Sequence, residues 1–352
     1  KEEKMGKIPQ NLETSTAWKG SVMNSKPELW IWQLQENEIQ ELLLATKDFL
    51  QKGVPLENIS KSNFKLTTLE NKLSLIKDDL TKGIGFKVIR GLNIESLSRE
   101  EIATLFMGIG SHIGLPRSQN AQGHLLGHVR NIGVDANDAN SRIYQTNQRQ
   151  TFHTDSADVV ALICLQTAQS GGESLLVSAE TIYNEMLKRR PDLAKLLFES
   201  IATDKRGEIE LGKKPYFSIP IFSWYKEKLS VIYQRQYIES AQRFEGVPTL
   251  TPLYIEALDL FDELANDSSL NISMNLEKGD MQFVHNHSML HDRGSFIDWP
   301  ELDKRRHLLR LWLSVPNDRE LPEVFSERFG TTTIGNRGGI IVEDTQTHVP
   351  LD

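Results

Sequence analysis

Residues 150–166 read QTFHTDSADVVALICLQ, and this stretch decides which fold the chain adopts. The run from Val159 to Leu165 is continuously apolar, which is typical of a strand buried on both faces. Just before it, His153 and Asp155 are two residues apart, so an extended backbone turns both side chains to the same face. An imidazole and a carboxylate side by side could bind one metal ion, although a histidine beside a capping aspartate gives the same pattern.

A metal ion held by this pair needs a further ligand, and the sequence offers three candidates close together. His285, His287 and His291 have the same parity, so in an extended segment they all face one side. Any of them would complete a set of two histidines and one carboxylate, the arrangement that leaves open positions on non-haem Fe(II). Spacing does not choose among the three, and the others must have different roles, such as supporting hydrogen bonds or packing.

A second informative stretch, over residues 305–313, reads RRHLLRLWL. Alternation along a strand places four of its side chains on one face, namely Arg306, Leu308, Arg310 and Trp312. A guanidinium buried among apolar side chains requires an anionic partner. A dicarboxylate cosubstrate held by two parallel hydrogen bonds would supply that anion. An internal salt bridge to Asp or Glu would supply it as well.

Periodicity over the rest of the chain predicts helices in the first third and mainly strands after residue 150. Helices are expected over residues 28–52, 66–82, 98–111, 178–189 and 251–266. Strands are expected over residues 85–91, 157–166, 229–233, 281–284 and 307–314. Residues 1–27 have no periodic pattern and are expected to form an N-terminal arm, with residues 28–352 as a single domain. The predicted fold class is α+β, a β-core with helices packed outside it.

The composition is that of an ordinary globular protein and limits the classes of partner. Forty basic and 48 acidic side chains give a net charge of −8, which argues against nucleic acid or an anionic membrane. Cys164 is the only cysteine, so no intrachain disulfide and no cysteine-rich zinc site can form. No apolar stretch approaches the roughly 20 residues of a membrane helix, and the charged start does not resemble a signal peptide. We therefore expect a cytoplasmic protein. The sequence leaves its oligomeric state open, and a homo-oligomer is possible.

Taken together, these motifs resemble the TauD/TfdA family of dioxygenases. The similarity consists of short motifs in a fixed order: Phe152-His153-Thr154-Asp155, Gly171-Gly172-Glu173-Ser174, Gly279-Asp280 before a strand, Asn286, Leu290-His291-Asp292-Arg293, and Arg306 with Arg310. Their order and spacing are more specific than any one motif. The motif-bearing part covers residues 150–315, approximately half of the chain.

The resemblance implies a double-stranded β-helix, or jelly-roll, with flanking helices and a metal site at one mouth. It implies His153, Asp155 and His291 as the metal ligands, since the family's distal ligand is the histidine followed by a small residue and Arg. Here Asp292 takes the place of the small residue, a departure that does not touch the metal. Ser174 stands where the family usually has Thr, whose hydroxyl helps to bind 2-oxoglutarate.

The resemblance also assigns roles to two arginines and to a polar loop. Arg306 matches the arginine that pairs with the distal carboxylate of 2-oxoglutarate. The position of Arg310 often faces an acidic group of the primary substrate in relatives, which implies a small, carboxylate-bearing or otherwise anionic substrate. Relatives place further substrate contacts before the His-x-Asp motif, and the candidates in loop 114–150 are Gln119, Asn120 and Asn147.

By this resemblance the chain is an Fe(II)- and 2-oxoglutarate-dependent dioxygenase that uses O₂, hydroxylates a small molecule and releases succinate and CO₂. Asp155 favours hydroxylation or desaturation over halogenation, because halogenating relatives commonly lack the metal carboxylate. Desaturation or carbon–heteroatom cleavage on the same iron stays open, as does a cupin-like hydrolase or isomerase with a divalent metal. A hydrolase, however, has no use for Arg306 paired with Ser174. A binding protein that has lost turnover is disfavoured by the intact ligand set.

Overall fold

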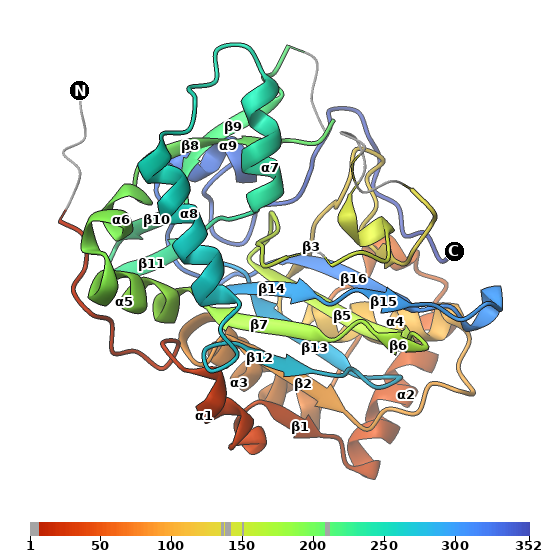
Figure 1. The fold of residues 1–352 in the computed structure, drawn as a ribbon. Helices are drawn as coiled ribbons and strands as arrows, with labels where there is room; N and C mark the ends of the chain where they lie inside the picture. The colour runs from red at the N-terminus through yellow and green to blue at the C-terminus, as the bar shows by residue number, and fades with distance from the viewer. Residues whose placement is uncertain (1–6, 135–136, 138–141, 150, 208–211) are drawn as a thin grey trace.

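Two β-sheets that face each other form the centre of the computed structural model, which describes residues 7–134, 137, 142–149, 151–207 and 212–352 (Figure 1). The larger sheet has the strand order β1-β2-β13-β5-β16-β3, and β4 also pairs with β16. Its pairs are antiparallel except β1 with β2, which run parallel. Its strands are β1 (Ile31–Gln33), β2 (Phe86–Arg90), β3 (Leu115–Pro116), β4 (Gly127–Val129), β5 (Val159–Gln166), β13 (Met281–His285) and β16 (His307–Ser314).

The smaller sheet is antiparallel, with the order β12-β7-β14. Its strands are β7 (Ser174–Ser178), β12 (Ile272–Met274) and β14 (Met289–Arg293), next to the short pair β6 (Ser170–Gly171) and β15 (Phe296–Ile297). Buried apolar side chains from both sheets pack together, among them Phe86, Val284, Leu176 and Met289. Two facing sheets of this kind form a jelly-roll, so the predicted fold class is confirmed.

Three helices cover the outer face of the larger sheet, namely α2 (Glu36–Gln51), α3 (Thr68–Lys82) and α4 (Arg99–Ser111). Odd-numbered side chains of the two central strands, such as Val159 in β5 and Leu311 in β16, pack against these helices. The even-numbered side chains of β16 therefore face the smaller sheet, as the alternation predicts, which brings Arg310 into the interior.

A second group of elements packs on the other side of the smaller sheet. It contains α5 (Ala179–Arg189), α6 (Pro191–Leu196), α8 (Pro252–Ala265) and the hairpin of β10 (Phe222–Tyr225) and β11 (Lys228–Val231). The predicted start of α5 is confirmed, because Ser178 Oγ accepts a hydrogen bond from the backbone N of Thr181.

A third group lies at the top of Figure 1, beyond one edge of the sheets. It contains the hairpin of β8 (Ser200–Asp204) and β9 (Tyr216–Pro220), together with α7 (Arg235–Ser240) and α9 (Ser326–Phe329). Phe217, Phe325 and Phe329 pack together in it and join the hairpin to α9. None of these four elements was predicted from periodicity.

Two predictions for the N-terminal region were wrong in detail. The helix expected from residue 28 begins only at Glu36, because the preceding Ile31–Gln33 pairs with β2 as strand β1. The segment expected to be a structureless arm contains the short helix α1 (Gly20–Asn24) and two tryptophan-anchored contacts. Trp18 packs against Phe86 with the ring planes tilted by 55°, and it donates its indole N–H to the carbonyl O of Ile84 at 2.8 Å. Single aromatic anchors of this kind have no periodicity to reveal them.

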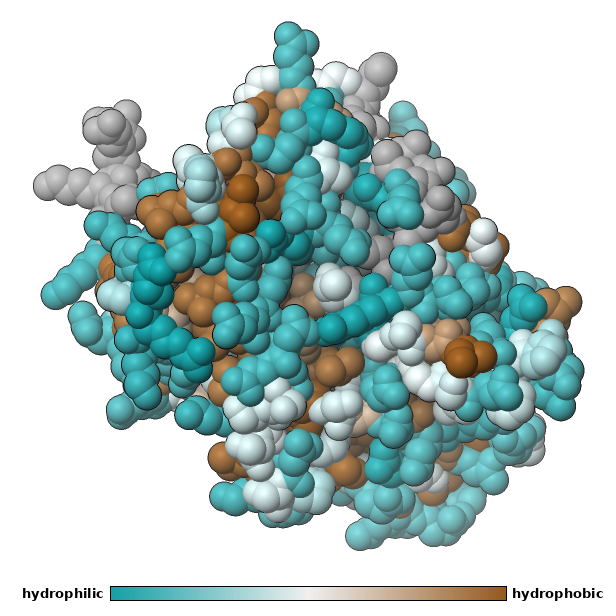
Figure 2. Space-filling model, viewed as in Figure 1, coloured by the Kyte–Doolittle hydropathy of each residue, from teal (hydrophilic) through white to brown (hydrophobic). Residues whose placement is uncertain are grey.

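The described part of the chain contains no helix with the length and apolarity needed to cross a lipid bilayer. Figure 2 shows hydrophilic residues over most of one face, with hydrophobic residues in small groups among them. Exposed large apolar side chains come from separate elements, for example Leu44 in α2 and Leu75 in α3. Scattered exposure of this kind is ordinary and requires no partner surface.

Candidate metal centre

His153 and His291 are direct neighbours across an antiparallel backbone bridge. The backbone N of His153 donates to the carbonyl O of His291, and the backbone N of His291 donates to the carbonyl O of His153, each at 3.0 Å. His291 belongs to β14, and His153 to the segment that leads into β5. The bridge holds the two imidazole centroids 4.3 Å apart, and both rings line one cavity.

The Asp155 carboxylate completes a group whose candidate ligand atoms all lie within 4.8 Å of one another. Its oxygens lie 3.8 Å from His153 Nε2 and 3.4 Å from His291 Nε2. The side-chain amide of Asn286 fixes this position, because it accepts from the backbone N of Asp155 and donates to the carbonyl O of Asp155. Asp155 Oδ2 is buried and has no hydrogen-bond partner in the described part of the chain. A buried carboxylate oxygen in this state requires a cation.

Electrostatics favour the protonation states that metal ligands need. Burial, assisted by His291, lowers the pKa of His153 to about 3, so its imidazole is neutral at neutral pH. Burial alone would raise the pKa of Asp155, but His291 and Arg310 outweigh it and bring the pKa below its usual value. His153 Nδ1 lies 2.8 Å from the carbonyl O of Thr151, an arrangement that places the proton on Nδ1 and leaves Nε2 for a metal ion.

The other two candidate histidines belong to a separate set of buried charges, here called the Asp158–His287 network: Asp158, His285, His287, Asp318 and Arg337. His287 Nε2 lies 2.6 Å from Asp158, and His285 Nε2 lies 2.9 Å from Asp318. Arg337 Nε donates to Asp158 at 2.9 Å. The chain turns between the end of β13 at His285 and the start of β14, so the histidines no longer share a face. The structure thus brings His291, and neither of the others, beside His153 and Asp155.

Arg306 and Ser174 line the same cavity as these three residues. Arg306 Nη1 is buried without a hydrogen-bond partner, and no Asp or Glu in the described ranges forms an ion pair with the guanidinium. Burial lowers the pKa of Arg306 to about 10, which still leaves it cationic at neutral pH. Gln282 Nε2 donates to Ser174 Oγ at 2.8 Å. Gly172 has φ +77°, and a Cβ there would lie 2.9 Å from Arg306 Nε, so this glycine keeps room for the guanidinium.

Arg293 is a residue of the cavity that the sequence reasoning did not single out. One of its terminal nitrogens donates to the carbonyl O atoms of Thr146 and Gln148, while Nε and Nη1 are buried without partners in the described chain. Burial, with Arg306 nearby, lowers the pKa of Arg293 to about 9. The signal was present in the sequence, because Arg293 is two residues after His291 and a strand turns both to one face.

The four residues expected to contact the primary substrate are placed differently from one another. Arg310 lines the cavity, donates from Nε to Gln119 Oε1 at 2.9 Å, and has its guanidinium 4.5 Å from the Tyr144 ring centroid. Gln119 is buried behind Arg310 and holds it in place. Asn120 binds within its own turn, and the side chain of Asn147 is exposed. The structure does not bring Asn120 or Asn147 to the cavity.

Two comparisons with known sequences bear on this chain. Residues 52–312 match the family described as "Taurine catabolism dioxygenase TauD, TfdA family". The chain is 32% identical over 303 residues to FR-33289 synthase of Streptomyces rubellomurinus, which covers 84% of this chain and 88% of that protein. It is 31% identical over 325 residues to the taurine hydroxylase-like protein SAT17 of Stachybotrys chartarum, which covers 90% of this chain and 82% of that protein.

Solved structures of the same shape include two oxygenases. Asparagine oxygenase in complex with Fe(II), 3-hydroxyasparagine and succinate superposes with a TM-score of 0.65 at 16% identity, covering 81% of this chain and 93% of that one. The non-haem iron oxygenase OrfP in complex with Fe and α-ketoglutaric acid gives a TM-score of 0.61 at 16% identity, covering 80% and 93%. At this identity the likeness establishes the fold, and it agrees with the jelly-roll of the two facing sheets.

Proposed function

The chain belongs to the TauD/TfdA family, and from this premise we propose that the cavity between its two sheets binds an anionic small molecule and hydroxylates it. Membership makes the chain an Fe(II)- and 2-oxoglutarate-dependent dioxygenase that uses O₂. When bound, iron and 2-oxoglutarate supply the oxidation of a C–H bond by O₂, with succinate and CO₂ as co-products. The residues of the chain supply ligation, orientation and the exclusion of water.

We assign the iron ligands to His153, Asp155 and His291. The observation that carries this assignment is the buried Asp155 Oδ2, which forms no hydrogen bond with any described residue, beside the imidazoles of His153 and His291. Two histidines and one carboxylate leave positions open on Fe(II) for a cosubstrate and O₂. Asn286 and the carbonyl O of Thr151 hold the ligands in orientation, the role that hydrogen-bonding partners of metal ligands usually have.

We assign 2-oxoglutarate binding to Arg306 and Ser174. The unpaired Arg306 Nη1 is available to a carboxylate in the cavity that it shares with the proposed iron ligands. A carboxylate there would form a charge-assisted hydrogen bond in a site that apolar side chains such as Leu162 and Leu308 keep dry. Arg293 adds a second unpaired cation to the same cavity, which raises its preference for a dicarboxylate.

We assign Arg310 to the anionic group of the primary substrate and Gln119 to holding that arginine in place. Arg310 lines the cavity beside His153 and Asp155, and none of the described carboxylates lies close enough to form an ion pair with it. The structural relatives support a small substrate and a hydroxylated product, because asparagine oxygenase binds 3-hydroxyasparagine and OrfP binds (3S)-hydroxy-L-Arg with succinate. Product mass distinguishes hydroxylation, which adds an oxygen atom, from desaturation, which removes two hydrogens.

An anaerobic titration tests these assignments one at a time. Fe(II) and 2-oxoglutarate added to the wild-type chain should produce the absorption band of the iron–2-oxoglutarate complex, and admitting O₂ should release succinate. The variant His291→Ala should lose iron binding. The variant Arg306→Met should keep iron binding but bind 2-oxoglutarate at least about tenfold more weakly, since it loses a charge-assisted bond.

Two outcomes would contradict the proposal. An Arg306→Met variant with unchanged 2-oxoglutarate affinity would remove Arg306 from the cosubstrate site. A wild-type chain that binds Fe(II) and hydrolyses or isomerises a substrate without forming succinate would support a cupin-like hydrolase instead. Arg189→Met, an exposed arginine in α5, serves as the control and should behave as the wild type in every step.

A further inference from the structure

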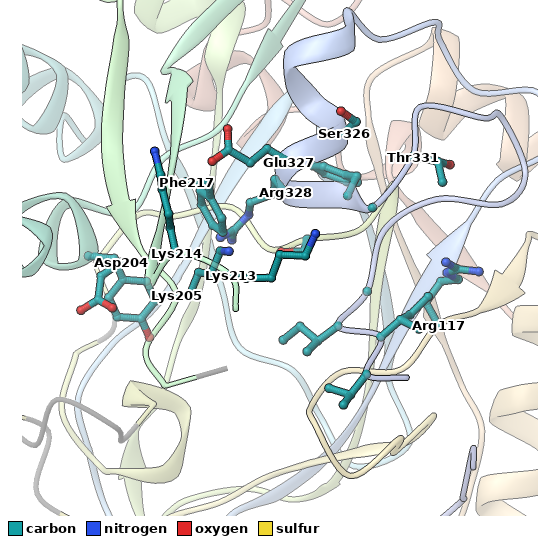
Figure 3. Close-up of a pocket in the computed structure, with 18 of the residues that line it drawn as sticks. Arg117, Asp204, Lys205, Lys213, Lys214, Phe217, Ser326, Glu327, Arg328 and Thr331 are labelled. Atoms are coloured by element: carbon teal, nitrogen blue, oxygen red, sulfur yellow. The ribbon is translucent and has the colours of Figure 1, made fainter. Parts of the chain in front are cut away.

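A second cavity, of about 670 Å³, opens beyond the proposed iron ligands. It is built outside the jelly-roll core, by the β8–β9 hairpin, α7, α9 and residues 339–342 (Figure 3). Its volume falls within the range of sites that bind small organic ligands, which is roughly 300–1,000 Å³. The reaction proposed above does not by itself require a space of this size.

This outer cavity is joined to the proposed iron site by a shared wall. Arg142, Tyr237 and Arg328 line the outer cavity, and they also line a small inner cavity with His153, Asp155 and Arg310. The two cavities lie on either side of these three side chains, with the residues that we assign to the iron on the inner side. The outer cavity is therefore placed to hold the distal part of the primary substrate.

The described residues that line the outer cavity include more cations than anions. Among the described lining residues, the cationic ones whose side chains form no ion pair are Arg117, Lys213, Lys214 and Arg328, and the acidic ones are Asp204 and Glu327. Asp204 is already neutralised, because Arg243 donates to it at 2.6 Å. In Figure 3, Lys205 and Arg328 lie near Phe217 and Arg117 lies across the cavity.

Arg328 differs from the solvent-exposed cations of the outer cavity because part of its guanidinium is buried. Its Nε is buried and has no partner among the described residues: no hydrogen bond is formed there, and none of the described carboxylates forms an ion pair with the guanidinium. The guanidinium lies 4.4 Å from the Phe217 ring centroid. Burial, with Arg142 nearby, lowers the pKa of Arg328 to about 10, so it is still charged at neutral pH. Arg328 as a whole is half-buried, and a buried guanidinium N–H without an acceptor is costly, so an anionic ligand in the cavity would relieve that cost.

We propose that the outer cavity binds a phosphoryl-type dianion carried by the primary substrate, a phosphate ester or a phosphonate, with Arg328 as its main contact. The planar guanidinium matches the paired oxygens of such a group, and several cations around one cavity favour two negative charges over one. The substrate's reacting carbon would then point through the shared wall toward His153 and Asp155. This inference rests on the proposed function, since it defines the substrate class of that same site.

Calorimetric titration with inorganic phosphate tests the inference directly. The chain is first saturated with Fe(II) and 2-oxoglutarate in the absence of O₂, so that the proposed 2-oxoglutarate site is filled. Phosphate should bind the wild type, and Arg328→Met should weaken that binding at least about tenfold through loss of a charge-assisted bond. Arg328→Lys keeps the charge without the planar fork and should fall between them. The matched control Arg189→Met should bind phosphate as the wild type does.

Further titrants define the chemistry that the site accepts. Acetate, a single negative charge, should bind at least about tenfold more weakly than phosphate, in line with one charge-assisted contact fewer. Methyl phosphate and methylphosphonate distinguish the two sources of the dianion, and the tighter binder identifies the class. Equal binding of acetate and phosphate, absence of phosphate binding, or unchanged binding by Arg328→Met would each overturn the inference.

The two proposals fail in distinguishable ways. Slow succinate release from 2-oxoglutarate without any primary substrate is measured on the wild type, and it reports on the proposed iron and cosubstrate residues. If the wild type releases succinate but its phosphate binding does not depend on Arg328, the substrate class alone is wrong. If the wild type neither binds Fe(II) nor releases succinate, the proposed function is wrong whatever the phosphate titration gives.

Discussion

The proposed metal centre and the Asp158–His287 network use the same residue types for opposite purposes. In each, histidines and carboxylates place their nitrogen and oxygen atoms within 4.8 Å of one another. In the network, Asp158 is paired with Arg337 and His287, and Asp318 is paired with His285, all fully buried. At the proposed metal centre, Asp155 Oδ2 has no hydrogen-bond partner among the described residues, and the three side chains border a cavity.

The difference shows that residue composition does not make a metal site. Arg337 supplies the positive charge that Asp158 needs, so this carboxylate does not require a metal ion. No such cation is bonded to Asp155 in the described chain, and Arg310 bonds to Gln119 instead. A cluster of His and Asp is thus a candidate metal site to the extent that its acceptors are left unpaired.

The largest expected effect is a loss of activity when one proposed iron ligand is removed. His291→Ala should reduce succinate formation by more than about 100-fold, because loss of a ligand exceeds the 10–100-fold effects of its supporting partners. The apo protein should lose less stability than the Asp158→Ala variant does, since the change leaves the buried Arg337–Asp158 ion pair intact. Succinate assays and urea titrations measure the two quantities. Retention of iron binding by His291→Ala would exclude His291 as a ligand, and exposed His348→Ala is the control.

A variant in the Asp158–His287 network should lower the stability of the folded chain. Asp158→Ala should lower the free energy of unfolding by about 3–5 kcal/mol, because it leaves the Arg337 guanidinium buried without its carboxylate. Urea-induced unfolding followed by circular dichroism gives the value. The exposed Asp303→Ala should change the same quantity by no more than about 0.5 kcal/mol. A loss below about 1 kcal/mol for Asp158→Ala would mean that the network is not the stabilising unit described here.

Metal addition should stabilise one region only. Fe(II), or Mn(II) as a redox-stable substitute, at 100 times its dissociation constant should stabilise the wild type by about 2.7 kcal/mol. The same addition should leave Asp155→Ala unchanged, because the proposed site then lacks its only carboxylate. Thermal unfolding with and without a chelator measures the shift. If the metal raised the unfolding temperature of Asp155→Ala as much as that of the wild type, the ion would have to bind at another site. The Asp158–His287 network would be the first alternative.

A smaller effect is expected from the residue that holds Asp155. Asn286→Ala removes both amide hydrogen bonds to the Asp155 backbone and should weaken metal binding by about 10–100-fold. Calorimetry with Mn(II) measures the affinity. If Asn286→Ala binds the metal as tightly as the wild type, the position of Asp155 is fixed by the bridge and the cavity walls instead.

The smallest expected effect is the network's response to acid. Burial lowers the pKa of His285 below its unfolded value of about 6.5, despite the opposing influence of Asp318 and with the help of Arg319 and His287. The unfolded chain therefore binds a proton that the folded chain does not, and stability falls as pH drops below about 6.5. One such group contributes at most about 1.4 kcal/mol per pH unit. His285→Gln should reduce the slope of unfolding free energy against pH by up to that amount, and an unchanged slope would contradict the assignment.

Much of the core was predictable because alternation reports burial directly. The apolar run of β5 and the shared face of Arg306 and Arg310 follow from the period of an extended strand, and the structure has both. The same reasoning placed His153 and Asp155 together before any fold was known. It failed for His285, His287 and His291, because the turn between β13 and β14 interrupts the alternation that the argument assumed.

The outer cavity could not have been predicted from local patterns. Arg142, Lys205 and Arg328 are separated by tens of residues and meet only through packing of α9 against the β8–β9 hairpin. Neither that hairpin nor the one-turn helix α9 carries a clear period. The placement of Asn120 and Asn147 could not be predicted either, because a polar loop supplies many amides. In the structure Asn120 bonds within its own turn, and the side chain of Asn147 faces solvent.

The reciprocal hydrogen bonds between His153 and His291 have a consequence for how the enzyme is loaded. The two imidazoles are brought together by backbone pairing, so the proposed site is organised before any ion binds. Removal of the ion should therefore leave the conformation of the site nearly unchanged. This is unlike small zinc domains, which unfold when their metal is removed. Iron stripped from the chain should therefore be replaceable by simple addition, with no refolding step between the empty and the loaded protein.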